Sequence, residues 1–141
     1  MSKDIRQVLI LCTGNSCRSQ MAEGLVNAYL GEDWQAFSAG TAPSGMVHPL
    51  AVRAMAEIDI DISEGVTDSV EIYRGMELDL VITVCDSAAK NCPVWLGDEE
   101  VKHMPFDDPT KLVGSDSDRI SACRQVRDLM RDRILPYLKN R

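Results

Sequence analysis

An eight-residue segment near the start of the chain combines a cysteine, a run of small polar residues and an arginine. It runs from Cys12 to Ser19 and places Arg18 six positions after the cysteine. Gly14 and Asn15 are residue types that readily adopt the positive φ angles of a tight loop. Backbone N–H groups of such a loop can converge on an anion, and a guanidinium can bind two of its oxygens. The segment therefore predicts an oxyanion site beside a thiolate nucleophile.

A loop that leads from a strand into a helix presents its N–H groups at the positive end of the helix dipole. Ser19 could also donate a hydrogen bond to the cysteine sulfur. The alternative is that a cysteine and an arginine at this spacing occur together by chance. A nucleotide P-loop is excluded, since the chain has no Gly-Lys-Ser or Gly-Lys-Thr. The residues expected to bind the oxyanion are Thr13, Gly14, Asn15, Ser16, Cys17, Arg18 and Ser19.

A pair of aspartates before a proline supplies the candidate general acid. An oxyanion attacked by a thiolate loses an oxygen-bearing group, which a nearby carboxylic acid can protonate as it leaves. Asp108, directly before Pro109, is the first candidate, and Asp107 is the second. The alternative is a simple Asp-Asp-Pro turn without a catalytic role. His48 and His103 are expected to be packed or exposed rather than catalytic.

The chain contains five cysteines, an odd number. In a reducing cytoplasm, redox chemistry, nucleophilic catalysis or metal binding is expected of them rather than structural disulfides. Zinc binding by Cys12, Cys17, Cys85 and Cys92 lacks the paired short spacings of structural zinc sites. Cys123 is expected to be buried on the apolar face of its helix, and Cys17 to be a bystander in the loop.

Alternating strands and helices are expected to position these residues. A continuous apolar run at 7–11 is typical of a strand buried on both faces of a parallel sheet. An open parallel α/β sheet follows, in which ligands bind beyond the carboxyl ends of the strands. Cys12 and Cys85 each follow such an end, so two distant cysteines would meet at one site. The predicted strands are 7–11, 34–39, 78–85 and 101–104, and the predicted helices are 16–30, 48–58 and 117–138.

Length and composition indicate one globular domain over 1–141. Of the 141 residues, 45% are hydrophobic and 26% charged. No apolar run approaches the roughly 20 residues that span a bilayer, and no secretory signal is evident, so we expect a cytoplasmic protein without a membrane partner. The net charge of -7 argues against nucleic acid, which needs clustered Lys and Arg. Without a long apolar seam, we expect a monomer.

The loop and its continuation resemble a known signature. Residues 12–24, Cys-Thr-Gly-Asn-Ser-Cys-Arg-Ser-Gln-Met-Ala-Glu-Gly, are similar to that of the low-molecular-weight protein tyrosine phosphatase superfamily, and most similar to its thioredoxin-coupled arsenate reductases. The likeness continues through 38–40, 59–63 and 106–109. It implies a flavodoxin-like open four-stranded parallel sheet with helices on both faces, and a cytoplasmic enzyme with a cysteine nucleophile.

The resemblance also implies a relay of three cysteines that reduces arsenate to arsenite. Cys12 would attack the oxyanion held by Arg18, while Asp108 assists departure of an oxygen. Cys85 would then attack Cys12 and release arsenite, and Cys92 would attack Cys85 and free Cys12. Thioredoxin would reduce the final disulfide. The spacing leaves glutathione with glutaredoxin open as the alternative donor.

The two later cysteines of the relay, Cys85 and Cys92, are seven positions apart. On one rigid helix their sulfurs would lie about 10 Å apart, which is too far for a disulfide. We therefore expect residues 86–92 to be mobile and to unwind or bend when the pair is oxidised.

Two other functions stay open. A low-molecular-weight phosphatase would use Cys12, Arg18 and Asp108 on phosphotyrosine or a small phosphoester, and would need no further thiols. A non-catalytic oxyanion or redox sensor would use the same loop. Tyrosine phosphatases typically carry tyrosines after the acid, where this chain has Thr110 and Lys111. This difference favours a small inorganic oxyanion such as arsenate, with phosphate or sulfate as analogues.

No cofactor is expected to be required. Some reductases of this family bind potassium beside the loop, and the matching residues here are Asn15, Glu23, Ser38 and Asp68. The resemblance thus allows a structural potassium ion. The alternative is that Glu23 and Asp68 are surface or capping carboxylates.

Overall fold

A four-stranded parallel sheet forms the centre of the chain. The computed structural model describes residues 5–85 and 100–141. All strand pairings are parallel, which confirms the expected open α/β fold. The strands lie in the order β2-β1-β3-β4 and comprise β1 (Arg6–Cys12), β2 (Trp34–Gly40), β3 (Leu80–Thr83) and β4 (Val101–His103).

Strand β1 lies inside the sheet because its side chains are apolar on both faces. Residues 8–11 have no exposed surface. Burial of each such side chain stabilises the fold by about 1.5–3 kcal/mol. The strand ends at Cys12, which is in register with Gly40 of β2. The predicted nucleophile therefore stands at the end of rigid, deeply buried backbone.

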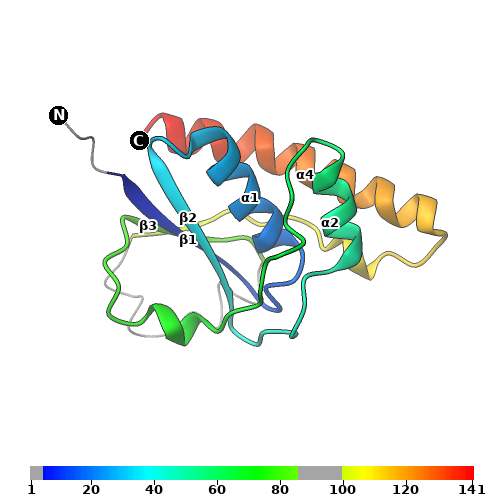
Figure 1. Cartoon of the computed structure of the whole chain (residues 1–141), viewed down its shortest axis with the longest axis horizontal. Helices are drawn as coiled ribbons and strands as arrows, with labels where there is room; N and C mark the ends of the chain where they lie inside the picture. The colour runs from blue at the N-terminus through cyan, green and yellow to red at the C-terminus, as the bar shows by residue number, and fades with distance from the viewer. Residues whose placement is uncertain (1–4, 86–99) are drawn as a thin grey trace.

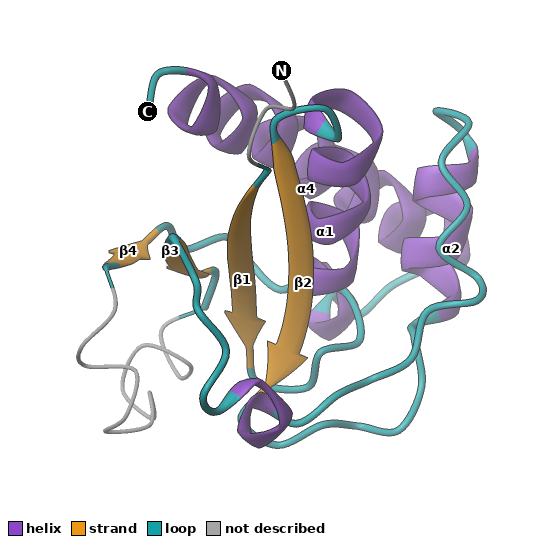
Figure 2. Cartoon of the chain, turned by 60° about the vertical axis from the view of Figure 1, so that its left-hand side comes forward, coloured by secondary structure: helices purple, strands orange, loops and turns teal. Residues whose placement is uncertain are grey.

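The three described α-helices lie together over one face of the sheet (Figure 2). Trp34 of β2 is buried on that face, and its indole Nε1 donates to the Leu138 carbonyl at 3.3 Å. Phe37 points to the opposite face, because side chains alternate along a strand, and its ring lies 5.6 Å from that of Tyr73. Tyr73 belongs to a short 3-10 helix, so helical segments pack on both faces (Figure 1). The helices are α1 (Arg18–Leu30), α2 (Pro49–Ala56), α4 (Asp116–Lys139) and the 3-10 helix η1 (Val70–Tyr73).

Observed and predicted elements differ mainly at their ends. Helix α1 begins two residues later than expected, because the residues before Arg18 form the polar loop. Two 3-10 helices, η1 and η3 (Pro109–Lys111), are absent from the prediction. Each follows a side chain, that of Ser69 or Asp108, which accepts a backbone N–H two residues on. Within the described residues, no helix is long and apolar enough to cross a membrane.

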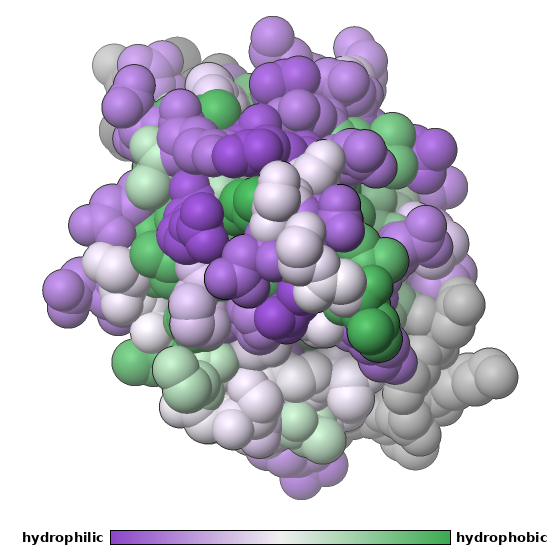
Figure 3. Space-filling model, turned by 90° about the vertical axis from the view of Figure 1, so that its right-hand side faces the viewer, coloured by the Kyte–Doolittle hydropathy of each residue, from purple (hydrophilic) through white to green (hydrophobic). Residues whose placement is uncertain are grey.

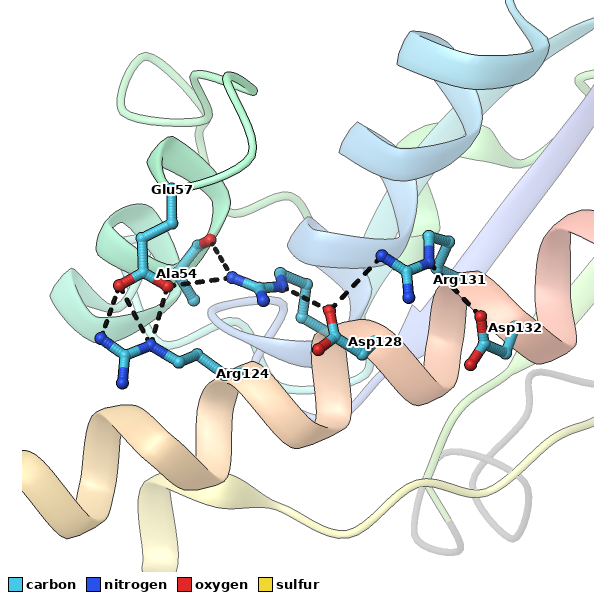
Figure 4. A network of polar contacts seen from close by, with 7 residues as sticks. Ala54, Glu57, Arg124, Asp128, Arg131 and Asp132 are labelled. Carbon is cyan, nitrogen blue, oxygen red and sulfur yellow. Dashed lines mark hydrogen bonds and ion pairs between the residues drawn. The ribbon is translucent and has the colours of Figure 1, made fainter.

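A row of ion pairs joins α4 to α2 (Figure 4). Arg124 binds the Glu57 carboxylate through two nitrogens, the shortest contact being 2.6 Å. Arg127 donates to the same carboxylate at 3.0 Å and to the Ala54 carbonyl at 2.7 Å. Its Nε also donates to Asp128 at 2.8 Å. These contacts fix α2 against the long helix that covers the sheet.

Candidate active site

The polar loop after β1 surrounds the Cys12 sulfur with hydrogen-bonding groups. Asn15 adopts the left-handed conformation, with φ 53°, and this turns its backbone N–H toward the sulfur at 3.2 Å. The Ser19 hydroxyl lies 2.9 Å from the same sulfur. Hydrogen bonds to a sulfur stabilise negative charge on it. The arrangement therefore suits a thiolate.

Asn15 also holds the loop in shape through its side chain. Its Nδ2 donates to the Ser19 hydroxyl oxygen at 2.8 Å, so the hydrogen of that hydroxyl is available to the Cys12 sulfur. Its Oδ1 accepts the Asp68 N–H at 2.8 Å, and its carbonyl accepts from Gln20 at 3.0 Å. The residue is completely buried. Asn15 is thus a positioning residue for both contacts on the sulfur.

Gly40 is a site residue that the sequence reasoning did not single out. A Cβ at this position would lie 2.5 Å from the Thr13 carbonyl oxygen and 3.1 Å from the Asn15 backbone nitrogen. Any larger residue would therefore clash with the loop and force the end of β2 away from it. Two sequence signals were present: a glycine at the predicted end of a strand, and its place in the family-like segment 38–40.

A cleft of about 970 Å³ opens over this loop at the carboxyl ends of β1 and β3. Cys85, just after β3, reaches it, and its sulfur lies 3.4 Å from the Thr13 hydroxyl. The fold therefore brings Cys12 and Cys85 to one cleft, as the strand ends predicted. Its described lining residues include Cys12, Thr13, Gly14, Ser16, Cys17, Arg18, Cys85, Asp107 and Asp108.

Arg18 and Asp108 face each other across the wall of the cleft. One guanidinium nitrogen of Arg18 donates to the Phe106 carbonyl at 2.9 Å, and another lies 3.5 Å from an Asp108 oxygen. The other Asp108 oxygen accepts the Thr110 N–H at 2.9 Å and the Thr110 hydroxyl at 2.6 Å. Asp107 lines the same cleft but is exposed. Of the two candidate acids, Asp108 is therefore the one whose carboxyl group has hydrogen-bond and ion-pair partners in the site.

These neighbours set the protonation of Asp108. Burial raises its pKa, but the hydrogen bonds from Thr110 and the charges of Arg18 and Lys111 outweigh this effect. The pKa of Asp108 consequently lies below its ordinary value. With no anion in the cleft, the carboxyl group is ionised near neutral pH.

The other sequence candidates fall into different places. Cys92, together with the expected mobility of 86–92, lies outside the described residues. His48 is the N-cap of α2, where its Nδ1 accepts the Leu50 N–H at 3.1 Å. Burial, followed by the charge of Arg119, lowers the pKa of His48. His103 Nδ1 lies 2.8 Å from the Thr83 hydroxyl, within the sheet.

The four residues matched to a potassium site do lie together, behind the loop. Ser38 and the charge of Asp68 both act on the pKa of Glu23, and the Asp68 backbone N–H donates to the Asn15 side chain. Burial raises the pKa of Glu23 to about 7. Burial, together with the charges of Asp68 and Glu23, raises the pKa of Tyr73 to about 12, although the sequence had not included this residue in the site. Two carboxyl groups are thus close together on a mostly buried site.

Comparison with known proteins identifies the family. The model of the low molecular weight phosphotyrosine protein phosphatase family matches residues 7–134, which include both the polar loop and the acid. The chain belongs to this family. Among similar proteins, the arsenate reductase of Halalkalibacterium halodurans is 47% identical to this chain, and the match covers 92% of this chain and 93% of the reductase. That of Bacillus subtilis is 41% identical with the same coverage.

Similar solved structures include both arsenate reductases and tyrosine phosphatases. An arsenate reductase in the phosphate binding state superimposes with a TM-score of 0.77 at 29% identity, over 96% of this chain and 98% of that chain. A low molecular weight protein tyrosine phosphatase from T. tengcongensis gives 0.78 at 25% identity, over 96% and 99%. The family therefore confirms the fold, while the choice of chemistry depends on the residues of the site.

Proposed function

We propose that this chain is an arsenate reductase whose cysteine relay is regenerated by thioredoxin. The observation that carries the proposal is the Cys85 thiol, which contacts Thr13 of the oxyanion loop at 3.4 Å. Hydrolysis of an ester needs only one nucleophilic thiol, whereas reduction by thiols needs a second one within reach. The relatives named arsenate reductase, at 41–47% identity, support the same choice.

The first step is attack on a bound oxyanion. The loop N–H groups and the Arg18 guanidinium hold arsenate above Cys12. The Cys12 thiolate attacks arsenic, so that an As–S bond forms and an As–O bond breaks. The oxygen takes a proton and leaves as water. Asp108 on the cleft wall supplies that proton.

The low pKa of Asp108 fits this role once the anion is bound. The negative charge of arsenate raises the pKa of a neighbouring carboxyl group. Arsenate also competes for Arg18, which otherwise helps to keep Asp108 ionised. Binding of arsenate therefore favours the protonated form of Asp108, which is the form that can donate a proton to the leaving oxygen.

The second step transfers the electrons. Cys85 attacks the Cys12 sulfur, an S–S bond forms, and the electron pair of the S–As bond stays on arsenic. Arsenic(V) becomes arsenic(III) and leaves as arsenite, while two thiols become one disulfide. Cys92 then attacks Cys85 and frees Cys12. Thioredoxin reduces the Cys85–Cys92 disulfide and restores all three thiols.

A phosphatase is the second candidate, because the family and one of the solved structures carry that name. The same loop and acid would hydrolyse a phosphoester through a cysteinyl phosphate. Thr110 and Lys111 line the cleft after the acid, and Phe106 is the one aromatic side chain among its described lining residues. This lining favours a small oxyanion over an aromatic ester.

We also propose a structural monovalent cation, of which potassium is the family's example. Glu23, Ser38, Asp68 and Asn15 provide oxygen atoms, the ligand type of a hard cation. The raised pKa of Glu23 fits this role, because a cation between two carboxyl groups would offset their repulsion. The ion would steady the Asn15 end of the loop and take no part in electron transfer.

The surface is consistent with a monomer, which we propose as the working state. Figure 3 shows a mainly hydrophilic face on which apolar residues form small separate areas. Extended interfaces between copies usually need larger apolar surfaces.

A pair of parallel assays separates the two candidate functions. One follows NADPH oxidation with arsenate, thioredoxin and thioredoxin reductase, and the other follows hydrolysis of an aryl phosphate. We expect arsenate-dependent NADPH oxidation in the wild type and its loss in Cys85→Ser, while slow ester hydrolysis persists in both. Rapid ester hydrolysis without arsenate-dependent NADPH oxidation would identify a phosphatase instead.

A further inference from the structure

Gln20 is a buried glutamine that contacts the oxyanion loop from the side of the core. It lies in the first turn of α1, with an exposed fraction of 1%. Its Nε2 donates to the Asn15 carbonyl at 3.0 Å and to the Val66 carbonyl at 2.9 Å. Both partners are carbonyl oxygens, which only accept hydrogen bonds, so the amide nitrogen must face them. One carbonyl is thus available for each of the two N–H groups of the amide.

The contact from Gln20 fixes the direction of one peptide group of the loop. The Asn15 carbonyl points to the buried amide, and in a trans peptide the following N–H points the opposite way. The N–H of Ser16 therefore points away from the core. Ser16 lines the cleft, and its own carbonyl accepts the His48 N–H at 2.8 Å. The loop thus presents the Ser16 N–H to the cleft, while the carbonyls on either side are bound elsewhere.

The segment 66–68 holds Asn15 in two ways. The Val66 carbonyl anchors the Gln20 amide, which in turn binds the Asn15 carbonyl. The Asp68 N–H donates directly to the Asn15 side chain at 2.8 Å. Asn15 has a φ of 53°, which is unfavourable for a residue with a side chain and persists only where neighbours hold it. Gln20 therefore holds the main chain of Asn15, whereas Asp68 holds its side chain.

Loss of the Gln20 donor would leave the Asn15 carbonyl unpaired in the core, which is costly. Rotation of the Asn15–Ser16 peptide relieves this cost, because it turns the carbonyl oxygen toward water in the cleft. The same rotation withdraws the Ser16 N–H from the cleft. A bound oxyanion then loses one donor and meets the partial negative charge of a carbonyl oxygen, so its affinity falls.

We propose that Gln20 is a positioning residue for oxyanion binding, which holds the Asn15–Ser16 peptide so that an N–H and not a carbonyl faces the anion. The contacts on the Cys12 sulfur come from other groups, the Asn15 N–H at 3.2 Å and the Ser19 hydroxyl at 2.9 Å. Gln20 thus sets the affinity for the anion and leaves the thiolate unaffected. This inference rests on the oxyanion site of the proposed function, but it holds whether that site reduces arsenate or hydrolyses phosphoesters.

The Gln20→Met variant tests this role, since it removes both donors and nearly keeps the length of the side chain. By titration calorimetry, we expect the Kd for inorganic phosphate to rise by about tenfold or more, the effect of one lost hydrogen bond to a charged group. Alkylation of Cys12 by iodoacetamide, without phosphate, should stay near the wild-type rate. Gln35→Met, at an exposed glutamine of β2, is the matched control and should bind phosphate like the wild type.

Two results of this titration would overturn the proposal. Unchanged phosphate affinity in Gln20→Met would show that the amide does not position the loop. Equal losses of phosphate affinity and of Cys12 alkylation would show that the loop has lost its shape as a whole. A wild-type protein that binds no phosphate would instead reject the oxyanion site itself, and with it the proposed function.

Nuclear magnetic resonance of the wild-type protein tests the same peptide group without a variant. A new hydrogen bond to an anion moves the signal of an amide proton downfield. We therefore expect saturating phosphate to shift the Ser16 amide proton downfield in the wild type, and to shift it much less in Gln20→Met. A Ser16 signal that phosphate leaves in place in the wild type would overturn the proposal, even if the variant fails to fold.

Discussion

Asn15 and Ser19 hold the nucleophile from two sides, and they form one unit. The Asn15 amide donates to the Ser19 oxygen at 2.8 Å, which leaves the serine hydrogen for the Cys12 sulfur at 2.9 Å. This chain of hydrogen bonds transmits the shape of the loop to the charge on the sulfur. It also explains why both side chains are completely buried beside an open cleft.

Removal of the serine hydroxyl should therefore slow the reaction of Cys12. A hydrogen bond to a charged group contributes about 1.5–3 kcal/mol. In Ser19→Ala, we expect alkylation of Cys12 by iodoacetamide at neutral pH to slow by about tenfold or more. Ser16→Ala, in the same loop, is the control and should react at nearly the wild-type rate. An unchanged rate in Ser19→Ala would show that the serine does not stabilise the thiolate.

The proposed acid makes a prediction about turnover and binding together. Asp108→Asn should lower the rate of arsenate turnover by about 10²–10⁴-fold, the usual contribution of a general acid. Phosphate binding should remain or become tighter, because a negative charge is removed from the cleft. Asp107→Asn is the matched control and should retain most of the turnover rate. The reverse pattern would assign the acid to Asp107.

The pH dependence follows from the same residue. The acid must be protonated in the substrate complex, so turnover should fall as pH rises through the Asp108 pKa of that complex. Measured kcat against pH should lose this descending limb in Asp108→Asn. A limb that survives the substitution belongs to another group.

Much of the site could be predicted from individual residues, because most of its residues lie close together in the sequence. Cys12, Arg18 and the loop between them are close in sequence, and Cys85 was placed by the rule that parallel strand ends meet. The role of Gly40 could not be predicted. It depends on how closely the end of β2 approaches Thr13 and Asn15, and no local pattern specifies that approach.

At the scale of elements, the ion pairs of Glu57, at the end of α2, with Arg124 and Arg127 of α4 hold these two helices together (Figure 4). Hydrogen bonds from Arg124, and then from Arg127, lower the pKa of Glu57 to about 2 from the ordinary value of 4.5. A carboxyl group with a depressed pKa stabilises the folded state above its unfolded pKa. That stabilisation disappears as pH falls from about 4.5 to about 2.

Substitution of this carboxylate should therefore show a pH-dependent loss. At neutral pH, Glu57→Gln should lower the free energy of unfolding by less than about 1 kcal/mol, because the pair is half exposed and screened by solvent. The difference from the wild type should vanish near pH 2. Asp132→Asn, which alters a more exposed contact to Arg131, is the control. Urea unfolding at several pH values measures the free energy of unfolding of each protein. A difference between Glu57→Gln and the wild type that does not change with pH would contradict the low pKa of Glu57.

The sequence located these elements well but their ends less well. Predicted helix 117–138 and observed α4 (Asp116–Lys139) agree because apolar positions recur regularly along it. Predicted strand 78–85 was longer than β3 (Leu80–Thr83), since the apolar run extends beyond the strand. Val84, just after β3, still makes backbone hydrogen bonds to Leu11 and Phe106. The 3-10 helices were missed because single side-chain contacts, such as Asp108 to Thr110, create them.

At the scale of the whole molecule, the carboxyl groups of Glu23 and Asp68 behind the loop link the stability of the fold to pH and to cations. Burial raises the pKa of Glu23 to about 7 from its ordinary 4.5. The folded state therefore holds a proton that the unfolded state releases, so stability falls as pH rises from about 4.5 to about 7. A cation that binds the ionised carboxylate would restore that stability.

Potassium should consequently stabilise the protein at alkaline pH. With potassium chloride in place of choline chloride at equal ionic strength, we expect Tm to rise at about pH 8 and to change little at about pH 5. Glu23→Gln should abolish the potassium effect, while Glu32→Gln, on the surface, should keep it. An equal potassium effect in Glu23→Gln would exclude this site.

The central claim is that electrons pass from Cys12 and Cys85 to arsenic, and a single-turnover experiment on Cys92→Ser tests it most directly. This variant can complete the first two steps but cannot resolve the disulfide. We predict one equivalent of arsenite per protein molecule and a Cys12–Cys85 disulfide in the peptide map. Absence of arsenite, or continued turnover without a disulfide between these two residues, would contradict the account.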